Sequence, residues 1–197
     1  MKIKSIWREP EERPKSYYIL NNIFSAITHG IGFGLAVAGL VLLIVKSAKT
    51  GQPLRVTCFT LYGVSLVLLY LFSTLYHSLI CTRARKVFRV FDHSSIFILI
   101  AGTYMTYTLV AIGGVKGWWM LGIIWALCLF GTLFYIFNQG KHVIFDTVLY
   151  VALGWMIILA GNVLYPILGS TGFWLLVWGG IAYTVGAILF SMRGVPY

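Results

Sequence analysis

The sequence predicts an all-α protein that crosses a membrane several times. Of its 197 residues, 59% are hydrophobic and only 10% are charged, whereas soluble domains carry about 25% charged residues. The same composition excludes a disordered chain, which needs low hydrophobicity and high charge. The apolar stretches are continuous over about 20 residues or more, which favours helices over a β-barrel, whose strands alternate in polarity over about 10 residues.

Six apolar stretches are long enough to be membrane-spanning helices. The segments between them contain cations, glycines, prolines or polar side chains, which typically end a span. We expect the helices, within a single domain covering 19–197, at roughly 20–45, 56–80, 90–112, 118–137, 143–165 and 173–192. Residues 1–18 mix acidic and basic side chains with two prolines, and we expect them to form a cytoplasmic tail.

The distribution of Lys and Arg predicts the orientation of the helices. With the N-terminus in the cytoplasm, eleven of the 15 cations lie on the inner side and four on the outer side. Cations gather on the cytoplasmic side of membrane proteins, next to anionic lipid. The net charge of +10 is therefore explained by membrane lipids as partners. Nucleic acid is not expected as a partner, because no basic run is interleaved with exposed aromatic residues.

Ionisable side chains inside the predicted spans are candidates for function, since an unpaired one in lipid costs several kcal/mol. His77 lies near the end of the second span, Asp92 near the start of the third and Asp146 near the start of the fifth. In the predicted topology all three lie at a similar depth, about 4–6 Å below the cytoplasmic boundary. We expect them to converge.

Three further side chains extend this candidate site. Ser73 precedes His77 by four residues, so both lie on one face of the second helix. His29 lies about 15 Å along the first helix, and His93 directly follows Asp92. Imidazole and carboxylate groups can bind Zn²⁺ or orient its ligands, and a zinc-bound water with a pKa of about 7 is a nucleophile at neutral pH.

Each candidate also has a structural interpretation. Asp92 and Asp146 are predicted near helix N-termini, where capping and the helix dipole favour a carboxylate. His29, His77 and His93 can instead form hydrogen bonds between helices. The residues by themselves leave both interpretations open.

Three segments of the chain resemble the bacterial hemolysin III family, which is related to the progestin and adipoQ receptors, including the adiponectin receptors. These segments are Asn22–Gly30 (NIFSAITHG), Leu71–Ser78 (LFSTLYHS) and Phe91–Tyr104 (FDHSSIFILIAGTY). The likeness runs from about residue 19 to the last residue. It implies a seven-span fold with a cytoplasmic N-terminus in a bacterial inner membrane.

The resemblance also implies a metal site near the cytoplasmic face. Its zinc ligands are a histidine on the second helix, here His77, and two histidines of a His-x-x-x-His motif on a seventh helix. The aspartate of the third helix, here Asp92, contacts the metal through water, and Ser73 lies beside it. Residues 1–197 contain six predicted spans and no such motif. We therefore expect a C-terminally truncated chain with one of three histidine ligands, in which zinc is not expected to bind.

The function implied by the resemblance is zinc-dependent hydrolysis of a lipid amide or ester bond, by analogy with the ceramidase activity of relatives. Asp92 and Ser73 are the catalytic candidates: Asp92 orients or deprotonates the attacking water, and Ser73 supports the oxyanion. His29, His93 and Asp146 are candidates for residues that surround the metal and these two catalytic side chains.

Two alternatives stay open. One is a pore-forming cytolysin, as the family name suggests. The other is a membrane sensor without turnover, in which zinc is structural. A pore predicts a polar stripe along a whole helix face, and the sequence shows none.

Overall fold

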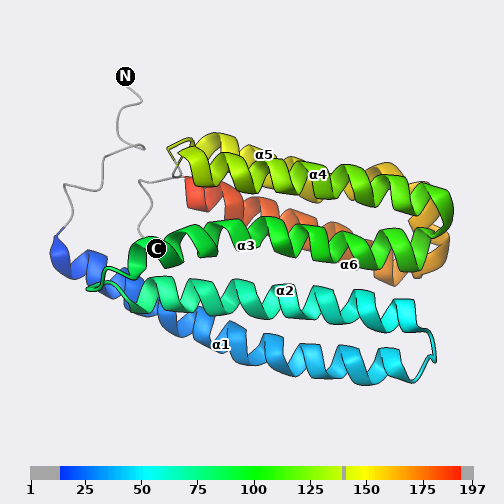
Figure 1. Ribbon diagram of the computed structural model, residues 1–197, viewed down its shortest axis with the longest axis horizontal. Coiled ribbons are helices and arrows are strands. Elements are labelled where there is room, and N and C mark those ends of the chain that lie inside the picture. Colours follow the sequence, from blue (N-terminus) through cyan, green and yellow to red (C-terminus); the bar gives the residue numbers. More distant parts are fainter. Residues whose placement is uncertain (1–13, 139–140, 192–197) are drawn as a thin grey trace.

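The computed structural model describes residues 14–138 and 141–191, which are helical almost throughout (Figure 1). The elements in chain order are α1 (Lys15–Ala48), α2 (Pro53–Ser78), α3 (Arg85–Met105), the π-helix η2 (Thr106–Ile112), α4 (Gly114–Asn138), α5 (Val143–Trp155), the 3₁₀-helix η3 (Met156–Ala160) and α6 (Gly161–Ser191). The described residues contain no β-strand. The predicted all-α fold is confirmed.

The helices lie side by side, and α2, α3 and α4 each run opposite to the helix before them (Figure 1). α1 packs against α2, α2 against α3 and α3 against α4, while α5 and α6 pack on α3 and on η2, respectively. One end of the bundle, at the left of Figure 1, holds the starts of α1, α3 and α5 and the ends of α2 and α4. We call it the polar end, because the six candidate side chains all lie in the half of the bundle next to it. These are His29, Ser73, His77, Asp92, His93 and Asp146.

The outside of the bundle is apolar, as expected for a surface in contact with lipid. Large hydrophobic side chains are strongly exposed on several helices, among them Leu35, Phe137 and Leu159. Among the residues that the structure describes, five helices are long and apolar enough to cross a membrane. Together these features indicate an integral membrane protein.

The last of these five apolar stretches, Val143–Leu189, contains 47 residues, which at 1.5 Å per residue is about 70 Å, more than twice the hydrocarbon thickness. It is interrupted at Gly169, whose φ of 68° and ψ of 173° are not helical. This break lies inside the turn expected between the fifth and sixth spans. Beyond it, α6 returns toward the polar end (Figure 1). Six crossings and a cytoplasmic N-terminus stay predictions.

Two predicted boundaries differ from the structure. α1 begins at Lys15, so residues 15–18 are helical rather than part of the expected tail, of which residues 1–13 lie outside the described part of the chain. The expected end of the last span, at residue 192, also lies outside it. α3 begins at Arg85 instead of near residue 90, because the cationic segment, predicted as a loop, continues the helix by more than one turn.

The third helix ends in the π-helical segment η2 rather than in regular α-helix. The backbone N–H of Gly113 donates to the carbonyl of Thr108, five residues earlier, at 2.8 Å. Gly113 and Gly114 then adopt φ of 67° and 57°, which glycine reaches without steric cost. In α4, Gly117 lies directly against the Thr108 carbonyl oxygen, where a Cβ atom would clash with it. The absence of a side chain at Gly117 therefore lets α4 pack onto η2.

We expect Gly117→Ala to lower stability by about 1–3 kcal/mol, because the added methyl group must push backbone apart. The measurement is thermal unfolding of the protein in detergent. The matched control is Gly122→Ala on the same helix, where a Cβ would meet nothing within 4 Å. Equal melting temperatures for the two variants would contradict the close contact between α4 and η2.

Candidate functional site

His29 and Ser73 form a direct hydrogen bond between α1 and α2. The two helices are antiparallel neighbours joined by a short connection, which brings residue 29 level with residue 73. The Nδ1 atom of His29 lies 2.5 Å from the Oγ atom of Ser73. Ser73 is buried, with 3% of its surface exposed. The hydroxyl group of Ser73 is thus held against an imidazole, away from the lipid.

His77, one turn beyond Ser73 on α2, turns into the bundle. Its ring packs edge-on against His29, with 5.6 Å between ring centroids, and its Nδ1 atom lies 3.1 Å from the Oδ1 atom of Asn22. The neighbouring ring of Tyr76 lies 4.8 Å away. The structure therefore brings His29, Ser73 and His77 together, as one group shared by α1 and α2.

Asp92 faces this group from α3. The rings of Phe72 and Phe91 stack at 5.0 Å and hold α2 and α3 together at this level. The side chain of Asp92 is 16% exposed, and its carboxylate interacts electrostatically with the imidazoles of His77 and His29. Because α3 begins at Arg85, Asp92 lies two turns inside the helix. The capping interpretation of Asp92 is therefore wrong.

His93 lies on the other side of α3, toward α4. Its ring stacks on Tyr135 with 5.0 Å between centroids and an interplanar angle of 8°. Its Nδ1–H donates to the carbonyl oxygen of Arg89 at 3.0 Å, and the hydroxyl of Tyr150 donates to the carbonyl of His93 at 3.0 Å. These contacts are those of a residue that joins helices.

Asp146 belongs to this second group rather than to the first. It lies in the first turn of α5, where the helix dipole favours a carboxylate, and it interacts electrostatically with His93 and His142. Its side chain is buried, with 4% exposed, and its Oδ1 atom has no hydrogen-bond partner among the described residues. The three residues expected to converge, His77, Asp92 and Asp146, therefore lie in two neighbouring groups rather than in one. His93 connects them, with its Nδ1 atom 3.6 Å from Oδ2 of Asp92.

Two residues of the site were not among the sequence candidates. Asn22 on α1 is 3% exposed and contacts His77, and Arg85 on α3 donates from Nη2 to Asn22 Oδ1 at 3.0 Å. Arg85 belongs to the cationic segment that the sequence predicts as a loop. Asn22 lies seven residues before His29, which places both on one face of a helix. That spacing is the signal that could have identified Asn22.

A zinc ion usually needs at least three protein donors. Within 14–138 and 141–191, no three His, Cys, Asp or Glu side chains form a group that could hold a metal ion. The Nδ1 atoms of His29 and His77 are already hydrogen-bonded to Ser73 and Asn22. The described residues therefore do not complete a zinc site by themselves.

We expect Ser73→Ala to destabilise the protein by about 1–3 kcal/mol, because it leaves the half-buried His29 without its hydroxyl partner. Thermal unfolding in detergent measures the effect. Ser78→Ala, an exposed serine at the end of the same helix, is the control and should melt like the unsubstituted protein. Identical melting of the two variants would show that the His29–Ser73 hydrogen bond contributes nothing to stability.

Comparison with known proteins identifies the family. The family model described as Haemolysin-III related matches residues 17–196. The chain is 44% identical to Hemolysin-3 of Bacillus cereus over 180 residues, which cover 91% of this chain and 82% of that protein. It is 40% identical to the Hemolysin-3 homolog of Bacillus subtilis (strain 168) over 181 residues, covering 92% and 85%. No solved structure matches. The all-helical bundle and these similarities lead to one conclusion: the chain belongs to the hemolysin III family of membrane proteins.

Proposed function

We propose that this protein is a membrane-embedded hydrolase that acts on an amide or ester bond of a lipid. The observation that supports the proposal is the hydrogen bond between Ser73 and His29, beside His77 and facing Asp92. A hydroxyl, two imidazoles and a carboxylate at one end of an otherwise apolar bundle are the groups that acyl-transfer chemistry needs. A lipid carbonyl can reach this level from within the bilayer.

The chemistry follows from the placement of these groups. Asp92 accepts a proton from a water molecule, and the water oxygen attacks the carbonyl carbon of the lipid. The Ser73 hydroxyl donates a hydrogen bond to the oxyanion that forms. When the tetrahedral intermediate breaks down, the proton passes to the departing amine or alcohol, and a fatty acid is released. Because the surroundings are apolar, each of these electrostatic interactions is stronger than in water.

The proposal includes zinc only if donor atoms outside the described residues bind the ion together with His77. A bound zinc ion would polarise the carbonyl and acidify the water. No step described above depends on it.

We expect Asp92→Asn to lower kcat for lipid hydrolysis by about 10²–10⁴-fold, the usual contribution of a general base. The assay uses vesicles that contain the protein and either a fluorescent ceramide or a fluorescent fatty-acid ester, and it measures the release of labelled fatty acid. His142→Gln, an exposed histidine at the same end, serves as the control and should keep its turnover.

Equal turnover of Asp92→Asn and the unsubstituted protein would refute the proposed role of Asp92. The assay is repeated with a chelator. Loss of hydrolysis on chelation would show that a metal takes part, and unchanged hydrolysis would confine the chemistry to the side chains named here.

Cytolysis is the second candidate function, because the similar proteins are named Hemolysin-3. The geometry favours the hydrolase instead, since the polar side chains gather at one end and do not line a whole helix face. We therefore expect vesicles carrying the protein to retain a trapped dye when no hydrolysable lipid is present. Dye release that persists in both Asp92→Asn and His77→Ala would favour a pore.

A further inference from the structure

The side-chain amide of Asn22 has its orientation fixed by neighbours on both sides. Its Nδ2 group donates to the backbone carbonyl of Tyr18 at 2.8 Å. On the other side, Nη2 of Arg85 donates to its Oδ1 atom at 3.0 Å. A flipped amide would direct an N–H group at the guanidinium and an oxygen at a carbonyl, so both hydrogen bonds would be lost. The oxygen of Asn22 therefore points toward Arg85 and His77.

This orientation determines which ring nitrogen of His77 carries the proton. The Nδ1 atom of His77 lies 3.1 Å from Asn22 Oδ1, and an amide oxygen can only accept. Nδ1 is thus the protonated nitrogen. In a neutral imidazole the other nitrogen, Nε2, then carries the free lone pair.

We propose that Asn22, itself held by Arg85, is a positioning residue that keeps His77 in its Nδ1–H tautomer and leaves Nε2 as the basic atom in the site. This inference rests on the proposed function, in which His77 lies beside the Ser73 hydroxyl that meets the substrate. Hydrogen bonds made by one ring nitrogen commonly set the tautomer of a functional histidine. Asn22 makes that contact from a different helix.

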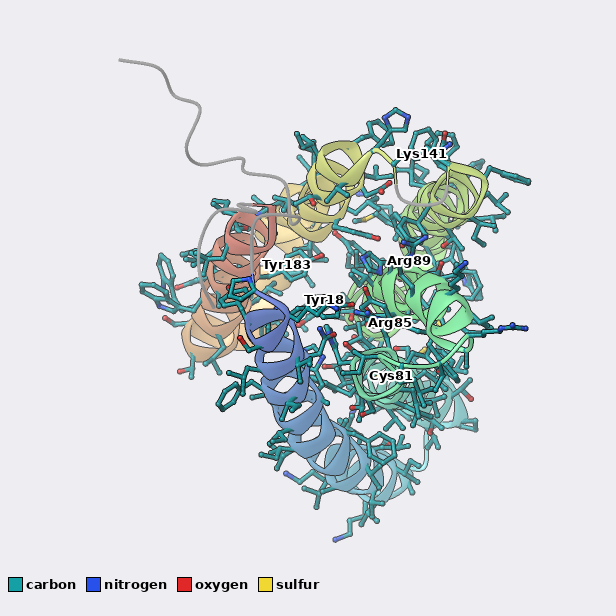
Figure 2. All side chains as sticks on the ribbon, turned by 90° about the vertical axis from the view of Figure 1, so that its left-hand side faces the viewer. Tyr18, Cys81, Arg85, Arg89, Lys141 and Tyr183 are labelled. Atoms are coloured by element: carbon teal, nitrogen blue, oxygen red, sulfur yellow. The ribbon has the colours of Figure 1, made fainter. Side chains whose placement is uncertain are left out.

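Arg85, which holds the Asn22 amide in place, is itself held by aromatic contacts. Its guanidinium lies between two tyrosine rings, 5.0 Å from the centroid of Tyr18 and 4.9 Å from that of Tyr76. Figure 2, which faces the polar end, shows Tyr18 and Arg85 directed toward one another across the space between α1 and α3. Because a guanidinium can only donate, its hydrogen bond keeps the Asn22 oxygen, and not the NH₂ group, directed toward His77.

Asn22 thereby joins the ends of three helices at one oxygen atom. Asn22 belongs to α1, His77 to the last turn of α2 and Arg85 to the first turn of α3. Asn22 is 3% exposed, so water competes little for its carbonyl. A contact that served packing alone could be replaced by apolar side chains of the same shape. A contact that sets a tautomer requires an acceptor.

The test is nitrogen-15 NMR of the protein labelled in its histidine rings, in detergent at about pH 8, above the ordinary histidine pKa. The chain has four histidines, and His77→Gln identifies the signal of residue 77. In the unsubstituted protein we expect Nδ1 of His77 to be protonated and Nε2 to be unprotonated. Asn22→Leu should shift His77 to mainly Nε2–H, whereas Asn22→Asp, which keeps an acceptor, should preserve Nδ1–H.

The control is Asn162→Leu, which removes an exposed asparagine of α6 and should leave all four histidine signals unchanged. Arg85→Met should weaken the preference for Nδ1–H without abolishing it. Retention of the His29, His93 and His142 signals shows that a variant is folded. If Asn22→Leu does not fold, the unsubstituted protein and Arg85→Met still decide the question.

An Nε2–H tautomer in the unsubstituted protein would overturn the proposal, as would an unchanged tautomer in folded Asn22→Leu. The hydrolysis assay separates this failure from failure of the proposed function. Full turnover in an Asn22→Leu variant that has lost the tautomer would remove the positioning role and leave the hydrolase intact. A correct tautomer in a protein without any turnover would refute the hydrolase instead.

Discussion

Polar groups inside this bundle depend on one another and on the helix backbone for hydrogen bonds, because the surrounding lipid offers none. That constraint explains the arrangement at the polar end. Ser73 on α2 is hydrogen-bonded to His29 on α1. The side-chain oxygen of Asn22 accepts hydrogen bonds from both His77 and Arg85. The apolar spans around them supply length and packing, and their backbone carbonyls, such as those of Tyr18 and Arg89, accept further hydrogen bonds. Each polar side chain therefore has a narrow choice of conformation, which is the condition for a preorganised site.

The constraint also separates the candidate residues into two groups with different roles. His29, Ser73, His77 and Asp92 gather around α1, α2 and the facing side of α3. His93 is held by aromatic and backbone contacts to α4 and α5, and Asp146 stays near it in the first turn of α5. The first group combines a hydroxyl, a carboxylate and imidazoles in a form suited to proton transfer. In the second group, His93 joins α3 to α4 and α5.

The sequence predicted the all-helical class because a membrane span needs only length and hydrophobicity, both of which are local properties. The helical break at Gly169 lies within residues 166–172, between the fifth and sixth predicted spans. Prediction failed where cooperation between segments decides the outcome. The cationic stretch before Asp92 looked like a loop by charge, yet it forms the first turns of α3. The packing of α4 onto η2 requires that Gly117 has no side chain beside the Thr108 carbonyl, and no periodicity reveals such a contact.

The chain by itself determined the class of protein, the family and the residue types available for chemistry, since these follow from composition, apolar length and motif. Tertiary structure decided which of those residues meet. The pairing of His29 with Ser73 and the position of Asn22 between His77 and Arg85 depend on the register and rotation of three helices relative to one another. A rotation of one residue, 100° about a helix axis, would turn any of these side chains toward lipid. Only packing fixes that rotation.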